Sequence, residues 1–173
     1  EGLVGIRKIN NSAVIIEVNS ETDFVSRNSE FHNLMSSILD IALENKMDIN
    51  KTVEDTKIII SDAVGKIGEN IVLKRMNFLE GNIYSYIHNI VTDGMGKIGV
   101  LVSFTSNSKD IDDIGKNICM HIAASSPKSI TIEDLDNEIV ENEKEIIMKQ
   151  LKDTGKPDNI LDKMMQGKLN KFY

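Results

Sequence analysis

The chain has 173 residues, of which 40% are hydrophobic and 27% charged, and these ordinary values exclude an intrinsically disordered chain. Its net charge of −7, with Lys and Arg scattered along the sequence, disfavours direct binding to nucleic acid, and no apolar run reaches the roughly 18 residues of a membrane span. The single cysteine, Cys119, excludes an intrachain disulfide, is typical of a small core residue and favours a reducing, cytoplasmic location.

A β-hairpin is predicted near the start of the chain. Residues 3–9 and 13–19 are rich in β-branched side chains, and a polar Asn-Asn-Ser turn separates them. A polar connection, residues 20–28, follows the second strand. After it the apolar residues recur at helical spacing, with Asn28 or Ser29 available as the N-cap, so a helix is predicted there.

A second helix and a second hairpin are predicted further along the chain. Thr52 opens a Thr-Val-Glu-Asp sequence that approximates a capping box, and Gly68 is expected to end this helix. Residues 71–79 have an extended pattern, and residues 83–91 and 97–104 predict a hairpin. In its second strand alternate apolar residues share one face: Ile98, Val100, Val102 and Phe104.

A third helix is predicted before Pro127, and a short extended stretch, residues 129–132, follows it. The apolar stripe of this helix is expected to consist of Ile111, Ile114, Ile118 and Ile122. The order of hairpin, helix and return strand occurs in residues 1–80 and again in residues 81–134. We therefore expect an α+β fold whose core has two small subdomains with these bounds, each an antiparallel sheet with helices.

The last segment, residues 135–173, predicts an antiparallel helical hairpin, the arm. Residues 154–157 form a tight break, and Asp158 is placed to cap the second helix. Apolar residues recur at helical spacing on both sides of the break: Val140, Ile147, Leu151, Leu161, Met164, Met165, Leu169 and Phe172. Because each seam is only about two heptads long, we expect the arm to be marginally stable alone.

The connection between the first hairpin and the first helix holds one large apolar ring. Residues 17–28 are Glu-Val-Asn-Ser-Glu-Thr-Asp-Phe-Val-Ser-Arg-Asn. On composition alone, two interpretations of Phe24 are open. Its ring either tucks under the following helix as a hydrophobic staple, or it is presented to a partner.

This string resembles the signature of the elongation factor Ts family, in which a similar string follows the second strand of the core. Further stretches resemble the family in the same order: residues 1–5, 66–71, 96–102, 120–124 and 154–157. The resemblance spans essentially the whole chain. Family members also carry a small N-terminal helical domain, missing here, and a continuation that is cut short here at Tyr173. We therefore expect a fragment or a processed product.

The resemblance implies a guanine-nucleotide exchange factor for elongation factor Tu, acting in translation elongation and needing no cofactor or metal of its own. In the family this segment enters the nucleotide-binding domain of elongation factor Tu near its magnesium site and promotes GDP release. The corresponding residues here are Thr22, Asp23, Phe24 and Val25. His88 is expected as a further partner contact.

Two other classes of function compete with this one. An enzyme would have to recruit His32, His88 or His121, but no pair has a metal-ligand spacing, and neither a nucleophile motif nor a Gly-rich phosphate loop is present. We therefore expect no catalysis of covalent chemistry. The alternative to an exchange factor is a scaffold without exchange activity, whose helical arm pairs with a second copy of the chain.

Overall fold

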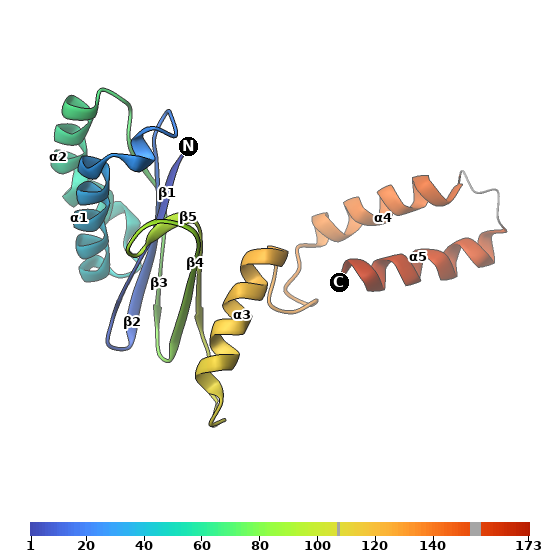
Figure 1. Cartoon of the computed structure of the whole chain (residues 1–173). Coiled ribbons are helices and arrows are strands. Elements are labelled where there is room, and N and C mark those ends of the chain that lie inside the picture. The colour runs from blue at the N-terminus through green and yellow to red at the C-terminus, as the bar shows by residue number, and fades with distance from the viewer. Residues whose placement is uncertain (107, 153–156) are drawn as a thin grey trace. The chain divides into compact units, whose positions relative to one another are not determined.

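A computed structural model describes residues 1–106, 108–152 and 157–173 of the chain (Figure 1). The chain forms two compact units, Glu1–Ser125 and Ser126–Tyr173, which are described separately below. Within the described ranges, no helix combines the length and the apolar character that crossing a membrane requires.

Among its described residues, the first unit contains one five-stranded sheet and three α-helices. Its elements in chain order are β1 Gly2–Ile9, β2 Ser12–Asn19, a 3-10 turn η1 Val25–Arg27, α1 Ser29–Asn45, α2 Ile49–Ile67, β3 Val72–Glu80, β4 Ile83–Thr92, β5 Met95–Ser103 and α3 Ile111–Ser125. All strand pairs are antiparallel, and the strand order is β3-β2-β1-β5-β4. This confirms the α+β class, and one sheet contains strands from both expected subdomains. The division into residues 1–80 and 81–134 stays a prediction.

The first hairpin forms as its sequence predicts. Ile9 pairs with Ser12, so the turn consists of Asn10 and Asn11 alone. Asn10 has φ 53°, a left-handed conformation that asparagine tolerates better than most residues. On the far side of the polar connection, the Asn28 side chain accepts a 2.8 Å hydrogen bond from the Glu30 backbone N–H and caps α1.

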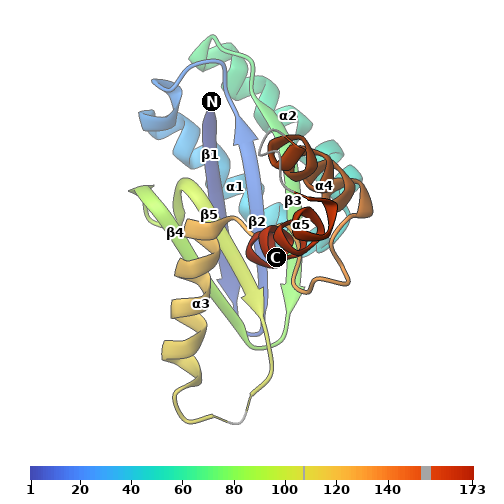
Figure 2. The same cartoon turned by 90° about the vertical axis from the view of Figure 1, so that its right-hand side faces the viewer.

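Helices α1 and α2 lie on one side of the sheet, whereas α3 lies on the other side against β4 and β5 (Figures 1 and 2). Between the sheet and α1 lies the main hydrophobic core. Its fully buried members include Val14, Ile16, Val18, Phe31, Met35 and Ile38. Burying each such side chain contributes about 1.5–3 kcal/mol, so this layer holds α1 firmly on β2.

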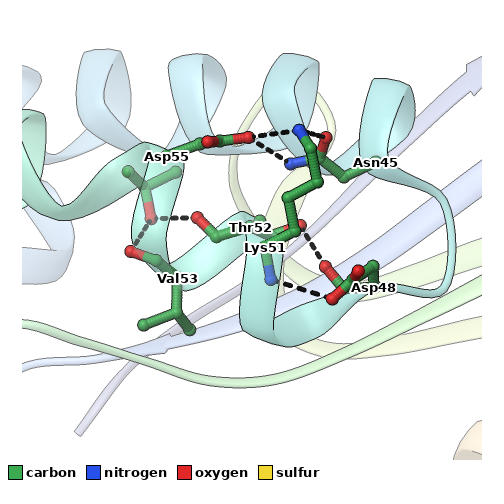
Figure 3. A network of polar contacts seen from close by, with 7 residues as sticks. Asn45, Asp48, Lys51, Thr52, Val53 and Asp55 are labelled. Carbon is green, nitrogen blue, oxygen red and sulfur yellow. Dashed lines mark hydrogen bonds and ion pairs between the residues drawn. The ribbon is translucent and has the colours of Figure 1, made fainter.

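Helix α2 begins one turn earlier than the sequence predicted. Asp48 is the N-cap, and its Oδ1 accepts a 2.8 Å hydrogen bond from the Lys51 N–H (Figure 3). Thr52 is fully buried, and its hydroxyl donates to the Asp48 carbonyl at 2.8 Å. The prediction of a start at Thr52 was wrong because this hydroxyl is satisfied inside the helix instead of at its end. Gly68, with φ 80°, ends the helix as expected.

A polar network links the end of α1 to the first turns of α2 (Figure 3). Lys51 Nζ donates to Asn45 Oδ1 at 2.5 Å and to Asp55 Oδ2 at 2.7 Å, and Asn45 Nδ2 donates to the same Asp55 oxygen at 2.9 Å. These hydrogen bonds, that from Lys51 above all, lower the pKa of Asp55 below its ordinary value.

The face through which helix α3 meets the sheet only partly matches the predicted isoleucine stripe, of which Ile111 and Ile122 are half-buried. Gly115 and Cys119 are buried, whereas Ile114 and Ile118 are 41% and 38% exposed. The reason is steric, because a Cβ on Gly115 would lie 2.3 Å from the ring of Tyr84, so only a glycine lets the helix approach β4 at this point. Cys119 is a core residue, as expected, and burial raises the pKa of its thiol.

The second unit is a helical hairpin, α4 Asn137–Lys152 and α5 Asp158–Phe172, whose helices run antiparallel (Figure 1). Its small core consists of Ile147, Leu151, Leu161 and Leu169, with Met164 and Met165 packed against it. Pro157 occupies the N-cap position that we expected of Asp158. Of the predicted break, residues 154–156 lie outside the described residues. Residues 129–132, expected to be extended, form no strand.

Candidate functional site

The connection between β2 and α1, residues 20–28, is a tightly hydrogen-bonded loop. At its start, the buried Ser20 donates its N–H to the Glu1 carbonyl at 3.1 Å and its hydroxyl to the Thr22 carbonyl at 3.0 Å. Further along, the buried Ser26 donates its hydroxyl to the Asp23 carbonyl at 2.6 Å, which closes the turn of η1. The backbone on both sides of Phe24 is therefore fixed.

Phe24 and Val25 have opposite environments. The Phe24 side chain is 78% exposed, whereas Val25 is 4% exposed and belongs to the main hydrophobic core. The staple interpretation, in which the Phe24 ring tucks under the following helix, is thus wrong. Exposing a phenylalanine leaves about 1.5–3 kcal/mol of burial energy unused, so the loop offers an apolar ring to solvent while its neighbour anchors the backbone.

The first half of the loop is bound by Glu69 and Asn70, which follow the end of α2. Glu69 Oε2 accepts from the Thr22 N–H at 2.9 Å, and its Oε1 accepts from the Thr22 hydroxyl at 2.5 Å. The Thr22 hydroxyl is the main cause that lowers the pKa of Glu69 below its ordinary value. The neighbouring Asn70 N–H donates to Glu21 Oε1 at 3.3 Å.

The other predicted site residues occupy different surroundings. Asp23 is exposed, and within the described ranges its carboxylate has no hydrogen bond or ion pair. His32, on α1, is half-buried and its Nε2 lies 2.8 Å from the Ser26 carbonyl, so a protonated Nε2 donates to the loop. In the part of the chain that the structure describes, no group of three or more His, Cys, Asp or Glu residues could hold a metal ion.

His88 lies away from this loop in the topology of the sheet. It is an exposed residue of the edge strand β4, and β5 and β1 separate that strand from β2, which leads into the loop. Its Nδ1 lies 3.1 Å from the Tyr86 hydroxyl. The structure therefore brings Thr22, Asp23 and Phe24 together on one loop but places His88 on a separate surface.

Sequence reasoning missed the residues that support the loop. Glu69 belongs to one of the stretches that resemble the family, but its contact with Thr22 spans 47 positions, so no local pattern could have revealed it. No sequence pattern indicated that His32 would contact the loop. Its bond to Ser26 follows from the way η1 folds back on the first turn of α1.

The fold and the loop define a class of protein: an α+β protein that presents an exposed aromatic ring on a hydrogen-bonded loop between a strand of its sheet and the following helix. The sequence model of a family described as Elongation factor TS matches residues 21–173. Curated relatives called Elongation factor Ts are 41% identical in Paracoccus denitrificans, 42% in Bartonella bacilliformis and 43% in Brucella anthropi, each over 100% of this chain. The chain spans 60–61% of the length of these relatives. It belongs to the elongation factor Ts family.

Proposed function

We propose that this chain is part of a guanine-nucleotide exchange factor that binds elongation factor Tu in its GDP form and promotes GDP release. Membership of the family supports the partner and the process, and translation takes place in the cytoplasm, where we place the protein. The observation that carries the mechanism is the 78% exposure of Phe24 on a loop whose backbone is fixed on both sides.

Phe24 would enter the nucleotide-binding domain of the partner, with Asp23 beside it. A GTPase holds its nucleotide through phosphate contacts and a bridging Mg²⁺, so a group that disturbs the ligands of that ion weakens the whole site. The exposed Asp23 carboxylate, which has no ionic partner within the described ranges, would compete for those contacts. Val25 would anchor the loop, because it is buried in the core of this chain.

The energetics require a second contact. In nucleotide exchange, the exchange factor and the nucleotide are two ligands of one GTPase with negative coupling between them. Each therefore weakens the binding of the other by the same factor. A thousandfold effect corresponds to about 4 kcal/mol, whereas burying one phenylalanine yields about 1.5–3 kcal/mol. We place the second contact on the surface of residues 81–134 that carries His88, where Ile90 and Ile98 are also exposed.

The test is the release of a fluorescent GDP from elongation factor Tu after addition of the chain. We expect faster release, and we expect Phe24→Ala to cut the rate at least about tenfold, the equivalent of roughly 1.4 kcal/mol. The matched control is Ile58→Ala, which removes a side chain of similar exposure, 76%, from α2 and should leave the rate unchanged.

Three other outcomes of this experiment would contradict the proposed function or the role of Phe24 in it. Binding without acceleration would support the scaffold, for which the arm would pair with a second copy of the chain. A folded Phe24→Ala variant that accelerates GDP release from elongation factor Tu as much as the unmodified chain does would refute the role of the ring. A loss of activity in Ile58→Ala as large as in Phe24→Ala would remove the link to this loop.

A further inference from the structure

Glu69 is positioned to control the loop from outside it. Gly68 ends α2 in the left-handed region, with φ 80°, and Glu69 follows it directly in the connection to β3. Both oxygens of its carboxylate accept from Thr22, one from the N–H and the other from the hydroxyl. Two bonds from one rigid carboxylate to one residue restrain its orientation as well as its position.

The bonded residue stands immediately before the presented segment. Thr22 precedes Phe24 by two positions, and the buried Val25 follows Phe24 directly. The segment between Thr22, which Glu69 binds, and Val25, which is buried in the core, is therefore too short to take many conformations. Without the contact from Glu69, the restraints that remain on the backbone before Phe24 are the hydrogen bonds of Ser20 and Ser26 and the longer, 3.3 Å bond from the Asn70 N–H to Glu21 Oε1.

We propose that Glu69 is a positioning residue for nucleotide exchange, which holds the Thr22–Phe24 backbone in the conformation that enters the partner. This inference rests on the proposed function. Its physical basis is preorganisation: a loop that is already ordered loses less conformational entropy when it enters the partner in the exchange step itself, so the maximal release rate is higher. Glu69 acts through Thr22, with which its carboxylate makes two hydrogen bonds.

A positioning role and a merely structural role give different kinetics. We would measure GDP release at increasing concentrations of the chain, which gives a maximal rate and a half-saturating concentration. If Glu69→Ala merely unfolded part of the sample, more protein would be needed but the maximal rate would be unchanged. A misplaced Phe24 in a folded protein lowers the maximal rate itself.

We expect Glu69→Ala to lower the maximal release rate about threefold to tenfold, the range that follows from losing one or two hydrogen bonds. Glu69→Gln keeps one acceptor oxygen and should lie between Glu69→Ala and the unmodified chain. The matched control is Glu54→Ala, which removes an exposed carboxylate from α2 that has no ion pair or hydrogen bond in the described ranges, and its rate should not change.

The decisive measurement repeats Glu69→Ala in a Phe24→Ala background. Because Glu69 acts through the placement of Phe24, its loss should have no further effect once the ring is gone. An equal loss in both backgrounds, or an unchanged maximal rate in the single variant, would overturn the positioning role. The proposed function would fail by a different result, namely a Phe24→Ala variant that gives the same release rate as the unmodified chain. Failure of the positioning role and failure of the proposed function are thus distinguishable.

Discussion

Replacing Gly115 by alanine tests how α3 packs on the sheet, and two opposing effects decide its sign. In a helix interior, alanine is favoured over glycine by about 0.5–1 kcal/mol. At this position, however, the new Cβ would lie 2.3 Å from two ring atoms of Tyr84. Overpacking of this kind costs about 1–3 kcal/mol, so the clash outweighs the gain in helix propensity.

The Tyr84 ring has little room to move away. It stacks on Phe104 with ring centroids 4.9 Å apart, and its hydroxyl donates to Asp112 Oδ1 at 3.1 Å. We therefore expect Gly115→Ala to destabilise the unit by about 0.5–2 kcal/mol net. The assay is urea unfolding followed by circular dichroism.

A matched substitution and a local probe complete the experiment. Gly65 lies in α2, and a Cβ added there would meet no neighbouring element within 4 Å, so Gly65→Ala should stabilise by about 0.5–1 kcal/mol. Cys119, one turn from Gly115 and the only cysteine of the chain, should react faster with a thiol reagent in Gly115→Ala. A Gly115→Ala variant as stable as the unmodified chain would refute the assigned face of α3.

Three further predictions concern a cap, a pH dependence and the arm. Asn28→Ala should destabilise α1 by about 0.5–2 kcal/mol in urea unfolding, because the cap to Glu30 is lost; an unchanged midpoint would contradict the cap. The pKa of Asp55 is lowered in the folded protein, so its contribution is present above the ordinary pKa of 3.8 and is lost as the pH falls through the folded value. Asp55→Asn should therefore lower the urea midpoint at pH 7 but not at about pH 2, and an equal effect at both pH values would argue against the network. Leu169→Ala should cost about 2–5 kcal/mol and melt the small arm in circular dichroism, whereas the half-exposed Ile160→Ala should leave it helical.

The sequence alone determined the features that depend on neighbouring residues. The first hairpin follows from two β-rich runs around an Asn-Asn turn, and the end of α2 follows from Gly68, because only a few residue types accept the left-handed conformation there. The apolar seams of the arm predicted a helical pair, and its core consists of residues from both seams. In each case the signal lies within a few positions of the structure it specifies.

Only the tertiary structure decided the features that depend on distant contacts. Tyr84 on β4 determines which face of α3 packs inward. The exposure of Phe24 belongs to the same group, since composition left a tucked and an open ring equally admissible. Glu69 reaches Thr22 across 47 positions, and such a contact exists only once α2 has packed on α1 and returned the chain to the loop.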